Sequence, residues 1–180
     1  MNEAAPFVLT LTLDPDAQAN FDCLRKAHFP SHRLVVGAHV TLFHALPGDL
    51  PAASAVASEA AAQQAFPVDV TGVRFLGRGV AFSLESLRLH RLRARFYQLW
   101  EARLTPQDRQ RWQPHVTIQN KADTIVAKAL YQRLRADFSP YQVVATGLGL
   151  WIYRNGPWEA VGSFPFADKT HGLAASAITT

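Results

Sequence analysis

The sequence predicts an α+β protein made of two related halves that face each other across a cleft. Three observations support this fold class. The 180 residues are 48% hydrophobic and 18% charged, which is the balance of a globular domain with a substantial core. Strand-like and helix-like segments follow in the order β-α-β-α-β and then β-α-β-α-β-β. Short stretches of the first half also recur in the second half.

Three strands and two helices are predicted in the first half. Residues 7–13 (FVLTLTL) alternate in the way of a strand with one apolar face. Asp14 and Pro15 then predict a helix start, because aspartate caps free N–H groups and proline suits the first turn. Periodicity and Pro or Gly turns give the other elements: a helix over 16–28, a strand over 38–46, an alanine-rich helix over 51–65 and a strand over 67–76.

The second half repeats this order and adds a strand. We expect, in sequence, a strand over 80–85, a helix over 87–104, a strand over 114–119, a helix over 124–138 and strands over 141–153 and 159–166. Asn155-Gly156 predicts a hairpin between the last two strands. Residues 167–180 are small and polar, so we expect a disordered tail after a single domain over 1–166.

The repeat is visible in two separate stretches. Residues 68–73 (VDVTGV) resemble residues 143–148 (VVATGL), and residues 39–42 (HVTL) resemble residues 115–118 (HVTI). The offsets between the paired stretches are nearly the same. Because a solenoid needs three or more units, two units instead indicate a pseudo-two-fold. We therefore expect two lobes, about 7–76 and 80–166, that share a cleft and exchange strands.

The second stretch carries a His-x-Thr motif in each half, namely His39-x-Thr41 and His115-x-Thr117. Side chains two apart on a strand point the same way, so each histidine shares a face with its threonine while the intervening valine faces the core. A two-fold would bring the imidazoles and hydroxyls together. Phosphodiester chemistry at a ribose can use such groups without metal, with one imidazole as base, one as acid and the hydroxyls on the phosphate oxygens.

The residues resemble the 2H phosphoesterase superfamily, which includes 2′-5′ RNA ligase and cyclic phosphodiesterase-like proteins. The resemblance rests on residues 38–43 (AHVTLF) and 114–118 (PHVTI), and on the closing segment 149–158, and it extends over roughly 7–166. It implies two pseudo-symmetric β-rich lobes with helices outside and a central cleft. It also implies that His39, Thr41, His115 and Thr117 are the catalytic tetrad.

Five further side chains are candidates for substrate binding. Trp151 and Tyr153 share a strand face and could stack a nucleobase, although covering the hairpin and the sheet edge is an equal alternative. Arg74 could contact a phosphate, or it could be an ordinary surface arginine. Alternation places Phe43 on the face of the first motif, where it would line the cleft. Lys121 could attract a phosphate, although its place at a helix entry needs no such role.

Two predictions concern the histidines and metals. By the same alternation His44 lies on the face of Val40 and Leu42, so we expect a packed or rim histidine. No carboxylate or cysteine accompanies either motif at ligand spacing, so we expect no metal and no cofactor.

These observations favour a metal-independent phosphoesterase that cleaves, or reversibly forms, 2′,3′-cyclic or 2′-5′ phosphodiester bonds in RNA or nucleotides. Two alternatives stay open: an RNA-binding module without turnover, and a hydrolase for a cyclic-phosphate metabolite unrelated to RNA. The net charge of +4 mildly favours anionic partners. A single cysteine and the lack of a long apolar run predict a cytoplasmic protein without membrane contact, and we expect a monomer.

Overall fold

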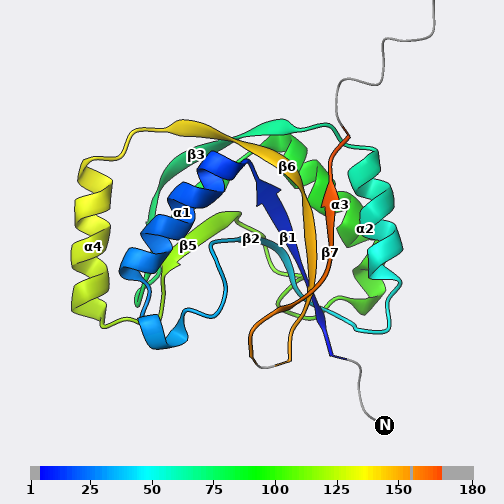
Figure 1. Cartoon of the computed structure of the whole chain (residues 1–180), viewed down its shortest axis with the longest axis horizontal. Coiled ribbons are helices and arrows are strands. Elements are labelled where there is room, and N and C mark those ends of the chain that lie inside the picture. Colours follow the sequence, from blue (N-terminus) through cyan, green and yellow to red (C-terminus); the bar gives the residue numbers. More distant parts are fainter. Residues whose placement is uncertain (1–4, 155, 168–180) are drawn as a thin grey trace, which may run out of the picture.

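A computed structural model of the chain describes residues 5–154 and 156–167. The predicted tail therefore lies, apart from Ala167, outside the described residues, as does Asn155 of the predicted hairpin. The elements are β1 (Phe7–Leu13), α1 (Pro15–His28), β2 (Val40–Leu46), α2 (Ala52–Ala61), β3 (Phe66–Phe75), β4 (Val80–Glu85), α3 (Leu87–Trp100), β5 (His115–Gln119), α4 (Thr124–Ala136), β6 (Tyr141–Ile152) and β7 (Glu159–Pro165). The predicted α+β class and element order are confirmed (Figure 1).

Most element boundaries agree with the sequence, and two differ for local reasons. Asp14 caps α1 as predicted, since its carboxylate accepts a hydrogen bond from the Ala17 N–H. Helix α2 ends at Ala61, four residues before the expected end, and Gln64 instead forms a short parallel bridge with Ala167. Helix α3 ends at Trp100 and continues as a 3₁₀ turn over Glu101–Arg103.

The strands form one antiparallel sheet that closes on itself like a barrel. Its order is β1-β2-β5-β4-β3-β6, and β6 pairs in turn with β1. The first part of β6 (141–145) pairs with β3, and the later part pairs with β1 on one edge and β7 on the other. Strand β3, from the first half of the chain, thus pairs with β4 and β6 from the second half, so the halves exchange strands.

The pairing register reveals the pseudo-two-fold. Val40 on β2 pairs with Val116 on β5, and Val68 on β3 pairs with Val143 on β6. In both cases a residue pairs with its own counterpart in the sequence repeat. An antiparallel pair of equivalent residues is what a two-fold axis passing between them produces. The axis therefore runs between the two copies of the His-x-Thr motif.

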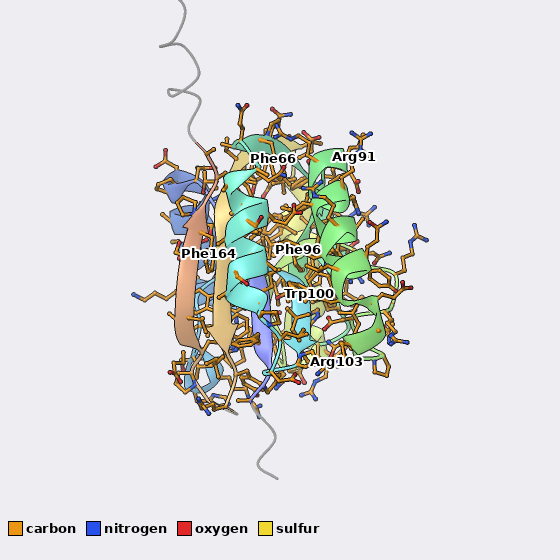
Figure 2. All side chains as sticks on the ribbon, turned by 90° about the vertical axis from the view of Figure 1, so that its right-hand side faces the viewer. Phe66, Arg91, Phe96, Trp100, Arg103 and Phe164 are labelled. Carbon is orange, nitrogen blue, oxygen red and sulfur yellow. The ribbon has the colours of Figure 1, made fainter. Side chains whose placement is uncertain are left out.

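The helices lie outside this sheet in two pairs (Figure 1). Helices α1 and α4 cover the part formed by β3, β4 and β5, whereas α2 packs on β6 and β7 and α3 lies on the same side. Figure 2 shows Phe96 and Trp100 of α3 pointing inward, where both rings contact Phe43 of β2. Arg91 on the same helix points outward. In the described part of the chain, no helix combines the length and apolar character needed to cross a membrane.

Candidate active site

The two His-x-Thr motifs lie side by side where β2 meets β5. Because the strands are antiparallel and Val40 pairs with Val116, His39 lies opposite Thr117 and Thr41 lies opposite His115. The two valines are fully buried, so the four polar residues share the other face. Standard strand spacings of about 5 Å across and about 6.6 Å along would place the Cα atoms of the two histidines roughly 8 Å apart.

Both motif imidazoles are held in the same way. His39 donates its Nδ1–H to the carbonyl of Gly37, and His115 donates its Nδ1–H to the carbonyl of Gln113, each at 2.8 Å. A carbonyl oxygen can only accept, so these bonds place the ring hydrogen on Nδ1. The Nε2 atom of each neutral ring is therefore the acceptor. The equivalence of the two bonds extends the pseudo-two-fold to the side chains.

The surroundings lower the pKa of both imidazoles. Burial lowers the pKa of His39 to about 4, with smaller contributions from the charges of Arg25, His44 and His115. Burial also lowers the pKa of His115, assisted by Arg74 and His44. In the ligand-free protein at neutral pH both rings are consequently neutral and can accept a proton. A proton donor arises once an anion near a ring raises its pKa.

Two buried arginines hold the motif strands from behind. Arg25 of α1 donates to the carbonyl of Thr117 at 2.6 Å and to that of Val36 at 3.1 Å. Arg93 of α3 donates to the carbonyl of Leu42 at 3.0 Å. Because these bonds fix the backbone on both sides of the axis, the motif side chains project from rigid supports.

A cavity of about 590 Å³ opens beside His39. Trp158 packs against the His39 ring with a centroid distance of 4.7 Å, and Trp151 lines the same cavity. The indole N–H of Trp151 donates to the Thr10 hydroxyl at 2.9 Å, which fixes its ring. Gly149 leaves the space for this contact, since a Cβ there would lie 2.9 Å from both of the bonded atoms. The cavity is therefore aromatic and preformed.

A smaller cavity of about 250 Å³ opens beside His115. Its lining includes Arg74, Arg111, His44 and the buried carboxylate of Asp108. The two motif histidines thus border cavities of different chemistry, one aromatic and one largely cationic.

The prediction that Phe43 lines the cleft is wrong, and the irregularity that buries Phe43 also changes the position of His44. Phe43 is fully buried in the core and does not face the cleft. On β1, Leu9 pairs with Phe43 while the next residue, Thr10, pairs with Thr41, so Leu42 is an extra residue in a β-bulge. The bulge shifts the alternation by one residue. His44 consequently points outward into the His115 cavity, where the sequence predicted a packed or rim position.

The remaining candidates lie in three different places. Arg74 and Trp151 line the cavities described above. Tyr153 follows β6, is 40% exposed and lines neither of these cavities. Lys121 is exposed at the end of β5, where it adopts a positive φ of 57°. Sequence reasoning gave no role to Trp158, His44 or Asp108, because their positions depend on the hairpin, the bulge and a contact across 64 residues.

Residues 5–154 and 156–167 contain no group of three or more His, Cys, Asp or Glu side chains placed to hold a metal ion.

The family is now defined by direct comparison. A family model described as the 2′-5′ RNA ligase superfamily matches residues 13–157. This match spans most of the chain, so the protein belongs to that superfamily, and the resemblance to 2H phosphoesterases is confirmed. A search of curated protein sequences found no match.

Several solved structures share the fold. TT0787 of Thermus thermophilus is 15% identical, with a TM-score of 0.60 over 89% of this chain and 97% of its own. E. coli LigT in complex with 3′-AMP is 17% identical, with a TM-score of 0.58 over 92% of this chain and 100% of its own. At these identities the likeness shows a common fold, in agreement with the α+β fold class predicted from the sequence.

Proposed function

We propose that the protein is a phosphoesterase that cleaves, or reversibly forms, 2′,3′-cyclic or 2′-5′ phosphodiester bonds in RNA or nucleotides by metal-independent two-histidine catalysis. The observation that carries the proposal is the patch formed by the two motifs, with His39 and His115 on one diagonal and Thr41 and Thr117 on the other. Each imidazole offers a free Nε2 to the same face. A phosphate at the centre of this patch would have a proton-transfer group on either side.

The chemistry follows from this placement. For hydrolysis of a cyclic ester, the neutral imidazole accepts a proton from water at Nε2 while the water oxygen bonds to phosphorus. The bond from phosphorus to a ribose oxygen breaks, and the second ring, as imidazolium, gives its Nε2 proton to that oxygen. The threonine hydroxyls donate to the non-bridging oxygens and stabilise the added charge. When a ribose 5′-hydroxyl takes the place of water in the same sequence, its oxygen bonds to phosphorus and gives its proton to the neutral ring, the bond from phosphorus to the 3′ oxygen breaks and the imidazolium protonates that oxygen, which forms a 2′-5′ phosphodiester.

A nucleoside fits the larger of the two cavities. The cavity of about 590 Å³ beside His39 is within the size range of small-molecule sites and carries two tryptophan rings. Base stacking on aromatic rings tolerates any base, which suits a reaction directed at the ribose and phosphate. The related fold of LigT has been solved with 3′-AMP, a ligand that combines these groups.

A substrate panel tests the proposal directly. The panel contains 2′,3′-cyclic mononucleotides, oligonucleotides with a cyclic end and 2′-5′-linked dinucleotides, each with and without excess EDTA. We expect turnover of at least one ester that persists in EDTA, because the proposed proton transfers involve only protein side chains. Turnover that disappeared in EDTA and returned with one divalent ion would contradict the metal-independent mechanism. RNA binding without turnover of any ester would favour the binding-module alternative.

A further inference from the structure

The cavity beside His115 contains charged groups that the two-histidine reaction does not use. His44 and Arg111 line it together with His115, and neither belongs to a His-x-Thr motif. Its volume of about 250 Å³ is several times the roughly 30 Å³ that one water occupies in the liquid. The cavity therefore has room for a further group of the substrate beside the reacting phosphate.

His44 is held in place by a buried carboxylate. Asp108 Oδ1 accepts hydrogen bonds from the His44 N–H at 2.8 Å and from His44 Nδ1 at 3.2 Å. Asp108 Oδ2 accepts from the Ala45 N–H at 3.0 Å. The Asp108 side chain is only 1% exposed, and although burial opposes ionisation, these bonds hold its pKa below the usual value. Asp108 thus fixes the imidazole through Nδ1 and leaves Nε2 for a ligand.

The remaining charges around the cavity are mostly positive. Arg74, Arg93 and Arg111 line it, and the guanidinium of Arg93 donates to the carbonyls of Leu42 and Asp108. The carboxylate of Asp108 is turned to the β2 backbone and to His44. An anion in the cavity would therefore meet guanidinium groups, and His44 in its doubly protonated form would donate to it through Nε2.

We propose that this cavity binds a second phosphate of the substrate, the one that joins the reacting terminal nucleoside to the preceding nucleotide, with His44 and Arg111 as its ligands and Asp108 as the positioning residue of His44. The proposal rests on the proposed function, because it takes the reacting phosphate to lie between His39 and His115. It names the substrate class as an oligonucleotide end in preference to a mononucleotide. A cyclic mononucleotide carries one phosphate and would leave the cavity without an anion.

Equilibrium binding tests this site without any need for turnover. The two probes are adenosine 3′-phosphate and adenosine 3′,5′-bisphosphate, titrated at one ionic strength by calorimetry. We expect the wild-type protein to bind the bisphosphate at least about 10-fold more tightly, which is the usual effect of a charge-assisted hydrogen bond. His44→Gln and Arg111→Gln should each remove most of this preference and leave the affinity for the monophosphate within about 2-fold.

Matched variants distinguish a loss of this binding site from a general loss of positive charge and from a loss of folding. Arg91→Gln removes an arginine that points outward from α3 (Figure 2), and His32→Gln removes an exposed imidazole, so both should keep the full preference. Asp108→Asn should lower affinity for the bisphosphate more than for the monophosphate if Asp108 acts through His44. Equal losses for both probes would assign it a merely structural role and contradict its positioning of His44.

The outcomes distinguish this proposal from the proposed function. A wild-type protein with equal affinity for the two probes, or variants that lower both affinities together, would overturn the second-phosphate site even if cyclic esters were hydrolysed. A preference for the bisphosphate that His44→Gln abolishes, in a protein that turns over no ester of the panel, would support the site and contradict the proposed catalysis. The expected kinetic counterpart is a drop in kcat/KM for a dinucleotide with a cyclic end, with little change for a cyclic mononucleotide.

Discussion

The two sides of the candidate site share the motif imidazoles and the hydrogen bonds that hold them, and they differ in the cavities beside them. His39 and His115 each donate Nδ1–H to the carbonyl two residues earlier, at the same distance. Beyond that point, His39 packs on Trp158 beside a large aromatic cavity. His115 instead faces Arg74 and the charged cavity that contains His44. The repeat is preserved at the two imidazoles and is lost in the groups that flank them.

The proposed function would explain this difference. Cleavage and formation of a phosphodiester bond are the reverse of each other, so the acid of one direction is the base of the other and equivalent imidazoles serve both. The terminal nucleoside of an oligonucleotide, however, carries a base at one end of its ribose and a 5′ phosphate at the other. A symmetric pair of cavities would bind such a molecule in two opposite orientations. Different walls around equivalent histidines would select one of them.

Removal of either imidazole is the largest expected effect. His39→Ala and His115→Ala should each lower kcat by about 10²–10⁴-fold, the usual contribution of a positioned proton-transfer group. The fold should survive, because the buried Val40 and Val116 remain in place, and thermal unfolding checks this. His32→Ala is the matched control at an exposed imidazole. Near-normal turnover in the double variant His39→Ala/His115→Ala would contradict the assignment of these histidines as catalytic residues.

Removal of the threonine hydroxyls should have the next largest effect on the rate. Thr41→Val and Thr117→Val retain the shape and remove the hydroxyl, so the rate should fall by about 10²-fold through weaker stabilisation of the phosphate charge. Neither change alters a titrating group, so the pH profile should keep its position. The Ser variants restore the hydroxyl and should recover most of the rate. Rates that were equal for the Val and Ser variants would show that the hydroxyls are not required.

Replacement of an aromatic side chain in the cavity beside His39 should have a smaller effect, on KM. Trp158→Ala should raise KM for a nucleotide by about 10-fold, because stacking contributes about 1–3 kcal/mol per base. Trp158→Phe keeps a ring and should recover much of the affinity. An equal rise in KM for a phosphodiester that lacks a base would contradict stacking, because such a substrate has no ring to lose.

The pH profile should show the mildest effect. The pKa values of His39 and His115 both lie below the usual 6.5, so the singly protonated free enzyme is most abundant at mildly acidic pH. Since kcat/KM reports the free enzyme, it should peak below pH 6.5 and fall toward pH 4. Bound phosphate raises both pKa values, so kcat should peak at a higher pH. Steady-state rates from pH 3.5 to 9 measure both, and a kcat/KM maximum above pH 8 would be incompatible with these shifts.

Much of the fold and the centre of the site could be predicted from the sequence. Alternation located β1 and β5, and Asp14 with Pro15 located the start of α1. The repeat also predicted that the two motifs would lie close together. The pairing of Val40 with Val116 places the motifs on adjacent strands. These predictions rest on local periodicity and on a duplication, and both can be recognised in the sequence alone.

The flanks of the site were less accessible to sequence reasoning. Alternation along β2 assigned Phe43 to the cleft and His44 to the opposite face, and one inserted residue in the strand reversed both assignments. The pairing of His44 with Asp108 spans 64 residues and has no local pattern. The contact of Trp158 with His39 joins segments 119 residues apart in the chain. Such features arise from tertiary packing, which periodicity does not record.

The partnership of β1 with β6 also sets the order in which the molecule can assemble. Thr10 bonds to Trp151, 141 residues later in the chain, and β1 pairs with β6 along its whole length. At about 5–20 residues per second a ribosome takes roughly 7–28 s to make the intervening chain. During that time the apolar strand β1 must wait for one of its two neighbours. Contacts of such long sequence separation also slow folding itself. The aromatic cavity, whose walls come from segments this far apart, is therefore completed only after β6 has been made.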